Sequence, residues 1–553
     1  MKKSLIAFLL LWLPVWLQGQ SLSVSNLPIL RINTKSRVIQ DEPKIPVVME
    51  FFDAAGPGQL NQVSTSPTIS TIAGIEYRGS TSQADFIFLP GYVKKPYGIE
   101  IWTDTTGLTA KKMSLVQMPE ESDWVLNASY NDRSFMRDFL AQLIAGRLGV
   151  LNSKTKFVEL VINDEYRGVY ILMEKIKQGK NRVPISDLYP TENTGDDVTG
   201  GYLLKIDKTS GSPSASFKSN YTSGILGTQK CEFQIEYPKY GIITQQQFSY
   251  IRDYINNWEQ KLMSDDMNDP KASFRNYMDM PSFVNYFILN ETVRNVDGYR
   301  LSSYLYKDKE SLGGKIKMGP AWDFNIAFGN ADYLNGWMTN GFVYKAMENT
   351  GGQNDAWQVP FWWNKLVQDA SFRKSVATRW KEVRKTFLNT TSLFASIDSA
   401  QVVLKEPLNR NFQKYPLMGK KIWPNYYVGA TLSDEVNWLK NWIQGRLTWL
   451  DAQLAIYDNP ILGNELPEMT TLIYPNPSKG LFNWKFYLSR QSEVNYQLID
   501  NQGRVLISSK NLNFGAGEQI YPVDFSHLPA GSYLFHWNST EGSSQKIRLT
   551  ISN

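Results

Sequence analysis

Residues 295–325 read NVDGYRLSSYLYKDKESLGGKIKMGPAWDFN, and this stretch decides how the rest of the chain is interpreted. Asp297 follows a helix-like segment, 282–294, and precedes a strand-like segment, 303–307. Gly313-Gly314 predicts a hairpin turn, after which Asp323 stands in an apolar run. A charge in such a run needs a cation or an arginine as its partner. The stretch therefore presents two aspartates, one on each side of a predicted hairpin.

The elements before this stretch follow a recognisable order. Arg78-Gly79-Ser80-Thr81-Ser82 forms a small-residue turn after a strand, and Lys94-Lys95 opens the strand that runs to Trp102. The apolar positions of 133–148 keep the helical period, and two strands, 156–162 and 168–174, come next. Protein kinases have their parts in the same order: a small-residue loop, a lysine strand, a helix, strands, helices and two aspartates.

The rare residues exclude the competing chemistries. The two histidines of the chain, His527 and His536, both lie in the last 30 residues, and there is one cysteine, Cys231. The main body therefore lacks the imidazole of a Ser-His-Asp or Cys-His site, a His-ligated metal and a multi-cysteine zinc site. Phosphoryl transfer needs carboxylates, cations and Mg²⁺, and no histidine. The formal charge of +5 is close to balance, so a nucleic-acid partner is not expected.

The composition of successive segments predicts the domain organisation. A length of 553 residues suggests two to four domains. Residues 1–20 carry a basic tip and a short apolar run, the pattern of a secretory signal peptide, and no later run is long enough to span a membrane. We expect a main domain over 21–457, including an N-terminal strand extension at 21–74, and a linker at 458–470. Short alternating strands over 471–553 predict a small β-sandwich.

The main body resembles the spore coat protein H (CotH) kinase family over roughly residues 28–457. The motifs that carry the resemblance are Leu27-Pro28-Ile29-Leu30-Arg31-Ile32, Ile75-Glu76-Tyr77-Arg78-Gly79-Ser80, Lys94-Lys95-Pro96-Tyr97-Gly98, Asp123-Trp124, Glu165-Tyr166-Arg167-Gly168-Val169-Tyr170, Gly200-Gly201-Tyr202-Leu203, Asn295-Val296-Asp297 and Trp322-Asp323-Phe324-Asn325.

The resemblance implies an atypical protein kinase that uses ATP with Mg²⁺ or Mn²⁺. Lys95 would contact the phosphates, with Lys94 as the second choice, and Arg78 and Ser80 lie in the loop expected to cover them. Asp297 would be the catalytic aspartate and Asp323 a metal ligand. Ser302 and Asn325 complete the expected metal site.

Several positions depart from the kinase pattern. Ser302 stands where kinases carry an asparagine, and Asn325 stands where many relatives have a second aspartate. The helix 133–148 has no glutamate to pair with the lysine, and Asp138 and Gln142 are the nearest types. Each departure weakens the charge arrangement for Mg²⁺, so a catalytically inactive kinase-like protein is the alternative.

The C-terminal part resembles the sorting domain of type IX secretion substrates from Bacteroidetes-like bacteria. Tyr474-Pro475-Asn476-Pro477, Gly480, Gly531-Ser532-Tyr533 and the basic tail Lys546-Ile547-Arg548 carry this resemblance, which covers about 471–553. It implies that the type IX machinery is a partner and that the protein is secreted or displayed on the cell surface.

Each candidate residue also has a structural interpretation. Asp297 could cap a turn, Asp323 could form an ion pair, and Lys94 and Lys95 could protect a strand edge. Trp337, Trp357, Trp362 and Trp363 could form a glycan-stacking platform, which would suit an adhesion protein, although most such residues belong to cores. A glycoside hydrolase would need two carboxylates roughly 5–10 Å apart, which a sequence cannot locate.

We therefore predict an α+β chain with an atypical protein-kinase-like two-lobed fold followed by a small C-terminal β-sandwich. The expected activity is transfer of the ATP γ-phosphate to a Ser or Thr hydroxyl of an exported protein substrate. The alternative is a kinase-like surface protein for adhesion or glycan binding.

Overall fold

The computed structural model describes residues 21–53, 58–79, 82, 93–209, 214–224, 226–264, 273–348, 350, 352–457, 471–488, 491–515, 517–540 and 544–552. The predicted signal peptide (1–20), the predicted linker (458–470) and Ser80 lie outside the described residues. The chain divides into two compact units, Met1–Asn459 and Pro460–Asn553. It contains both helices and sheets, in agreement with the predicted α+β class.

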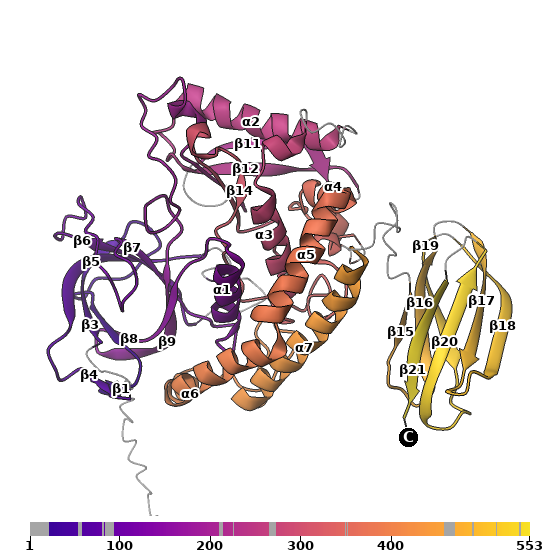
Figure 1. The fold of residues 1–553 in the computed structure, drawn as a ribbon. Helices are drawn as coiled ribbons and strands as arrows, with labels where there is room; N and C mark the ends of the chain where they lie inside the picture. Colours follow the sequence, from indigo (N-terminus) through magenta and orange to yellow (C-terminus); the bar gives the residue numbers. More distant parts are fainter. Residues whose placement is uncertain are drawn as a thin grey trace, which may run out of the picture. The chain divides into compact units, whose positions relative to one another are not determined.

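A closed barrel forms the first part of the larger unit (Figure 1). Its strands are β2 (Ile29–Asn33), β3 (Ile45–Phe52), β5 (Ile69–Tyr77), β6 (Tyr97–Trp102), β7 (Asp123–Asn127), β9 (Glu165–Glu174) and β8 (Thr155–Ile162), in this order. The parallel pairing of β2 with β8 closes it, and apolar side chains such as Trp124 and Tyr170 fill it. Residues 21–74, which were expected as an extension, supply strands of the barrel itself. β1 (Val24–Ser25) and β4 (Asn61–Gln62) form a separate small sheet.

Helix α1 (Arg137–Leu148) starts four residues later than the periodicity predicts. The carboxylate of Asp132 explains the difference because it accepts hydrogen bonds from the backbone N–H groups of Ser134 and Arg137, at 3.1 and 2.9 Å, and so holds a turn before the helix. The helix ends at Gly149, whose φ of 84° is the left-handed conformation that glycine adopts without strain.

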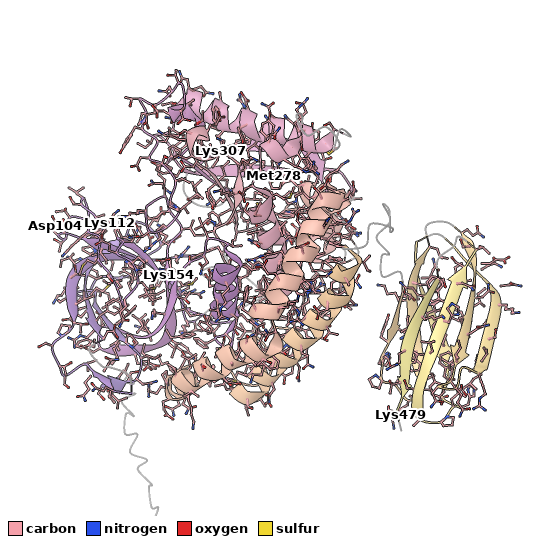
Figure 2. All side chains as sticks on the ribbon, viewed as in Figure 1. Asp104, Lys112, Lys154, Met278, Lys307 and Lys479 are labelled. Carbon is pink, nitrogen blue, oxygen red and sulfur yellow. The ribbon has the colours of Figure 1, made fainter. Side chains whose placement is uncertain are left out.

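A five-stranded sheet forms the second part of the larger unit. Its strand order is β11 (Ala215–Ser223), β12 (Gln229–Tyr237), β10 (Tyr202–Ile206), β13 (Ser303–Lys307) and β14 (Lys317–Met318). Helix α2 (Gln245–Met263) lies along this sheet. Figure 2 shows Lys307 below α2, and its ammonium group lies 4.5 Å from the centre of the Tyr254 ring on that helix. The cation thus belongs to the contact between helix and sheet.

The remaining helices follow α3 (Met280–Val293), which contacts α1, α5 and α7. They are α4 (Trp362–Gln368), α5 (Ala370–Thr386), α6 (Thr390–Lys414) and α7 (Leu432–Ile456). Short 3-10 turns occur at Asp197–Thr199, Phe274–Asn276, Glu310–Leu312, Val343–Lys345 and Gly352–Asn354. None of the helices in the described ranges is long and apolar enough to cross a membrane.

The smaller unit consists of two antiparallel sheets. One contains β15 (Thr471–Tyr474), β16 (Leu481–Leu488) and β19 (Gly517–Asp524), and the other contains β18 (Val505–Phe514), β17 (Ser492–Ile499), β20 (Gly531–Ser539) and β21 (Ser544–Ile551). Buried side chains from both sheets form one cluster, in which the rings of Trp484 and Trp537 lie 5.5 Å apart. The C-terminal region is therefore β-rich, as its sequence rhythm predicts.

Candidate active site

Five of the predicted site residues line one cavity of about 490 Å³ in the larger unit. They are Arg78, Asp297, Ser302, Asp323 and Asn325. The volume falls within the range of small-molecule sites. Arg78 follows barrel strand β5, whereas the other four residues come from the segments around the β13–β14 hairpin. Parts of the chain more than 200 residues apart in sequence numbering thus meet at one site.

Asp297 is held by one of its two carboxylate oxygens. Its Oδ1 accepts hydrogen bonds from the Arg300 Nη2 at 2.6 Å and from the Tyr333 hydroxyl at 3.3 Å. Arg300 is itself fixed because its Nη1 donates to the Asp355 carboxylate at 3.2 Å. No described residue donates a hydrogen bond to the Oδ2 of Asp297. That oxygen is available to accept a proton from a hydroxyl in the cavity.

Asp323 stands where several acidic groups approach one another. Its backbone adopts a φ of 64°, a left-handed conformation that is uncommon for a non-glycine residue. Its side chain is open to the cavity, but protein atoms crowd around it. Burial, and after it the carboxylates of Asp138, Asp297 and Asp207, raise its pKa to about 7, while the Arg78 guanidinium opposes them. A bound cation would remove this repulsion.

One asparagine couples the two aspartate loops. The Asn295 Oδ1 accepts a hydrogen bond from the backbone N–H of Asp297 at 3.2 Å, and its Nδ2 donates to the backbone carbonyl of Asp323 at 3.0 Å. Asn295 is 3% exposed, so water competes little for these bonds. The short, buried Asn295 side chain therefore ties the backbone at Asp297 to the backbone at Asp323, and this link limits how far the two carboxylates can move apart.

Asp138 on α1 fixes the Asp323 segment from the other side. Its Oδ1 accepts a hydrogen bond from the backbone N–H of Phe324 at 2.8 Å, and its Oδ2 accepts from the Asn127 side chain at 3.1 Å. Burial raises the pKa of Asp138 to about 6. Asp138 also lines the cavity. The acid that stands on this helix in place of a glutamate thus holds the Asp323 loop, and no lysine in the described ranges forms an ion pair with it.

Sequence reasoning missed Lys205, Asp207 and Lys208, which also line the cavity. Lys205 forms an ion pair with Glu236 at 2.6 Å, and the Lys208 ammonium lies 5.6 Å from the centre of the Trp357 ring. The Asp207 Oδ2 accepts a hydrogen bond from the Ser302 hydroxyl at 3.4 Å. The only available signal was their position directly after the Gly200-Gly201-Tyr202-Leu203 motif.

Three polar atoms of the cavity walls are buried without a hydrogen-bond partner among the described residues. They are the Arg78 Nη1, the Ser129 Oγ and the Asn131 Oδ1. The Arg78 guanidinium packs on the Trp322 ring, 5.3 Å from its centre, and no ion pair within the described structure neutralises it. Buried polar atoms are rarely left unpaired, so these three indicate a polar ligand, and the guanidinium indicates an anionic one.

The predicted phosphate-binding lysines are not among the residues that line this cavity. Lys94 is 2% exposed, and its ammonium donates to the carbonyls of Ala128 and Val169 and to the Asn411 Oδ1. Burial lowers the pKa of Lys94 below its ordinary value. The backbone carbonyl of Lys95 accepts a hydrogen bond from the Tyr170 hydroxyl at 3.0 Å. The nucleotide role of these two lysines stays a prediction.

The donor set of the cavity suits a metal that a nucleotide helps to hold. Among the described residues, no group of three or more His, Cys, Asp or Glu side chains is arranged to hold a metal ion alone. Mg²⁺ is usually bound by one or two carboxylates together with substrate phosphates and water. Asp323 with Ser302 or Asn325 on the protein side, and phosphates on the Arg78 side, meets that requirement.

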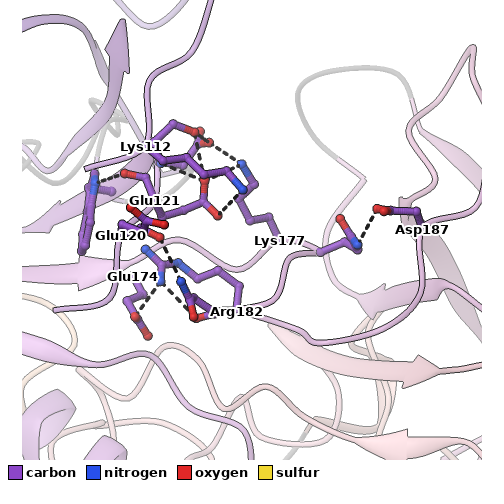
Figure 3. A network of polar contacts seen from close by, with 12 residues as sticks. Lys112, Glu120, Glu121, Glu174, Lys177, Arg182 and Asp187 are labelled. Atoms are coloured by element: carbon purple, nitrogen blue, oxygen red, sulfur yellow. Dashed lines mark hydrogen bonds and ion pairs between the residues drawn. The ribbon is translucent and has the colours of Figure 1, made fainter. Parts of the chain in front are cut away.

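A network of ion pairs fixes the segment that leaves the barrel (Figure 3). Lys177 binds Asp123 at 2.8 Å and Glu121 at 3.4 Å, and Arg182 binds Glu174 at 2.6 Å. Glu174 is the last residue of β9, and the next strand, β10, already belongs to the second sheet. The connection between the barrel and that sheet is therefore braced beside the cavity wall at Met173.

The structure divides the four tryptophans of the predicted glycan platform. Trp362 and Trp363 are 0% exposed and belong to the core beside α3. Trp357 is 37% exposed and lines the cavity. Trp337 stacks on Tyr426 with ring centres 4.8 Å apart. Trp423, which sequence reasoning did not consider, is 38% exposed, lines the cavity and stacks on Tyr333.

Comparison with known proteins places the chain in a family. Residues 75–450, well over half of the chain, match the family model described as CotH kinase protein. The chain belongs to the CotH kinase protein family. Residues 472–551 of this CotH-family protein match the model described as secretion system C-terminal sorting domain. Both predicted resemblances are confirmed, and together they support an exported protein.

Other comparisons add nothing to this assignment. No curated protein matches the CotH-family chain. Among solved structures, the Pseudomonas fluorescens alkylpurine DNA glycosylase AlkC, bound to DNA containing an abasic site analog, is 14% identical over 39% of this chain and 70% of that chain. The TM-score of 0.12 is too low to indicate a common fold.

Proposed function

We propose that this protein is an exported atypical protein kinase that transfers the γ-phosphate of ATP to a Ser or Thr hydroxyl of a secreted or surface protein. The observation that carries the proposal is the meeting of Arg78, Asp297 and Asp323 at one cavity in a family named for kinases. The barrel and the five-stranded sheet would serve as the two lobes of a kinase-like fold, with the braced segment after Glu174 between them.

Asp297 is suited to the role of base. Arg300 and Tyr333 hold its Oδ1, which orients the carboxylate and leaves the Oδ2 for the substrate hydroxyl. The ion pair with Arg300 fixes the carboxylate, whose Oδ2 would accept the proton of the substrate hydroxyl. In phosphoryl transfer, positioning of the hydroxyl matters more than its deprotonation, and Asn295 supplies it by tying Asp297 to the Asp323 loop.

Arg78 is the cation best placed to receive phosphates because its Nη1 is buried at the cavity wall without a partner from the described residues. Bound ATP with Mg²⁺ or Mn²⁺ would supply the transferable group and the charge that neutralises it. Asp323 would bind the cation on the protein side, and Asp138 would hold the Asp323 loop in place through the Phe324 N–H. Val125, Met173 and Trp322 form an apolar part of the same wall, where a flat base could pack.

The proposal is tested by incubating the purified protein, without its signal peptide, with γ-labelled ATP, Mg²⁺ or Mn²⁺, and exported proteins from the same cells. We expect label on Ser or Thr residues of an acceptor or of the protein itself. Asp297→Asn should lose this transfer but still bind ATP, whereas Asp253→Asn, an exposed residue of α2, should behave as the wild type. Absence of label with either metal, together with absence of ATP binding, would end the proposal.

The C-terminal unit would direct export. Its match to a secretion sorting domain supports the type IX secretion machinery as a partner and a final location outside the cell or on its surface. Deleting residues 471–553 should leave the protein inside the cell envelope, and fractionation with an antibody to the main unit would detect this.

Adhesion or glycan binding by an inactive kinase-like protein is the second candidate. The observation that favours it is the aromatic rim of the cavity, where Trp357 and Trp423 are more than a third exposed. Exposed tryptophan faces are the usual stacking partners of sugar rings. A glycan panel probed with the wild type and with Trp423→Ala would identify this function if the wild type binds a glycan and the variant does not. For an inactive kinase-like protein, ATP should cause no thermal shift.

A further inference from the structure

We propose that Asp207, a residue outside the kinase-like motifs, is the metal ligand that compensates for Ser302, so that a divalent cation is held between Asp207 and Asp323. The proposal rests on the phosphoryl-transfer function and deepens it. In protein kinases, two metal ions are held by the aspartate of the second loop and by the asparagine of the catalytic loop. This chain keeps the aspartate, as Asp323, but carries Ser302 at the asparagine position.

Strand register explains how a distant carboxylate reaches this position. β10 and β13 pair antiparallel, with Ile206 opposite Ser303 at the end of the ladder. Asp207 follows Ile206 and Ser302 precedes Ser303, so the next pair beyond the ladder brings these two residues together. The Ser302 hydroxyl lies 3.4 Å from the Asp207 Oδ2. A carboxylate oxygen of Asp207 therefore lies beside Ser302, whose hydroxyl is a poorer metal ligand than the asparagine amide of kinases.

The other Asp207 oxygen is already bound. Its Oδ1 accepts a hydrogen bond from the backbone N–H of Lys208 at 2.8 Å, which orients the carboxylate and leaves Oδ2 toward Ser302. Lys205, which lines the same cavity, has its own partner in Glu236 at 2.6 Å. Asp207 and Asp323 line the same cavity, so their carboxylates place two negative charges around one space. Two carboxylates that repel across a cavity favour a cation between them.

The cavity also shows independent signs of a ligand. Ser129 and Asn131 are 4% and 2% exposed, and the Ser129 Oγ and the Asn131 Oδ1 have no hydrogen-bond partner in the described part of the chain. Both residues line the cavity that contains Asp207. Asp207 and Asp323 therefore belong to a cavity in which uncharged polar atoms also lack hydrogen-bond partners among the described residues. This distinguishes the pair from a simple cluster of surface acids.

The test measures metal binding directly. Free Mn²⁺ is followed by electron paramagnetic resonance during titration of the full mature protein with a non-hydrolysable ATP analogue present. We expect Asp207→Asn to weaken Mn²⁺ binding by about tenfold or more, as loss of an oxygen ligand should. Affinity for the ATP analogue without metal should not fall. Asp253→Asn, which removes an exposed charge from α2, serves as the matched control and should leave Mn²⁺ affinity unchanged.

A second variant separates ligation from folding. Ser302→Asn restores the kinase-type ligand, so the double variant Asp207→Asn/Ser302→Asn should recover most of the lost Mn²⁺ affinity. Wild-type Mn²⁺ affinity in Asp207→Asn would overturn the inference and leave the kinase proposal standing. A loss that Ser302→Asn does not recover would also overturn it, because Asp207 would then act only on the fold. Failure of the wild type to bind the analogue with or without metal would overturn the proposed function itself.

Discussion

Replacing Lys94 with methionine tests whether this lysine is a structural cation or a phosphate ligand. Methionine keeps the length and most of the volume of the side chain but removes the ammonium. That ammonium donates to three oxygens, those of Ala128, Val169 and the Asn411 side chain, and lies 4.5 Å from the centre of the Tyr170 ring. These contacts join the barrel to helix α6, which carries Asn411.

The cost follows from the acceptors that lose their donor. The Asn411 Oδ1 keeps the Val169 N–H as a donor at 3.1 Å, so two buried backbone carbonyls are the main loss. Each buried acceptor left unpaired costs about 1–3 kcal/mol, or about 2–6 kcal/mol for the pair. Part of this is offset because a buried ammonium no longer has to be desolvated. We therefore expect Lys94→Met to lower the free energy of unfolding by about 3 kcal/mol.

The assay is denaturant unfolding of wild type and variant, followed by an ATP titration of the folded variant with Mg²⁺. Lys112→Met, which removes a lysine with a side chain 63% exposed, is the control and should change stability by less than about 1 kcal/mol. ATP affinity of the folded Lys94→Met protein should stay within about threefold of the wild type. Unchanged stability, or a tenfold loss of ATP affinity in a folded variant, would refute the structural interpretation.

Three further predictions follow from single contacts. Asp297→Asn should lower the rate of phosphate transfer by about 10²- to 10⁴-fold with ATP affinity nearly unchanged, and equal losses of rate and affinity would contradict its role as a base. Burial raises the pKa of Glu259 to about 7, well above its unfolded value of 4.5, so the folded state holds this proton and stability should fall as the pH rises from about 5 to 8. In Glu259→Gln, the fall in the free energy of unfolding between pH 5 and pH 8 should be smaller by up to about 2 kcal/mol, as measured by denaturant unfolding at each pH. An unchanged pH dependence would show that other groups cause it. Gly200→Ala should abolish stable expression because the added Cβ would lie 1.8 Å from the backbone nitrogen of Lys309, whereas Gly241→Ala, with open space around it, should express, and a soluble Gly200→Ala protein would contradict the packing described.

Motif order was enough to anticipate which residues of the second aspartate region lie together. Asp297 and Asp323 flank a hairpin, and a hairpin brings its two ends close whatever the rest of the fold does. Arg78 could be added because the small-residue turn after its strand takes the place of the loop that covers the phosphates in the kinase-like order. The order of the motifs and the family resemblance therefore predicted five of the residues that line the cavity.

The lysines and Asp207 could not be placed by the same reasoning. Lys94 lies next to a strand in the sequence, but the oxygens that surround its ammonium come from residues 128, 169 and 411. Asp207 meets Ser302 through strand pairing between residues 95 positions apart. The parallel pairing of β2 with β8 that closes the barrel joins residues still farther apart in sequence, such as Ile29 and Glu159. Such long-range pairings leave no periodic signal, because each partner alone reads as an ordinary strand or loop residue.

The central claim is that the cavity of Arg78, Asp297 and Asp323 binds ATP with a divalent cation. The most direct measurement is thermal unfolding of the mature protein with ATP and Mg²⁺, compared between wild type and Asp323→Asn. A ligand at about a hundred times its Kd adds about 2.7 kcal/mol of stability, so the wild type should shift clearly upward and Asp323→Asn should not. An unshifted wild type, or an equal shift in both proteins, would contradict the account.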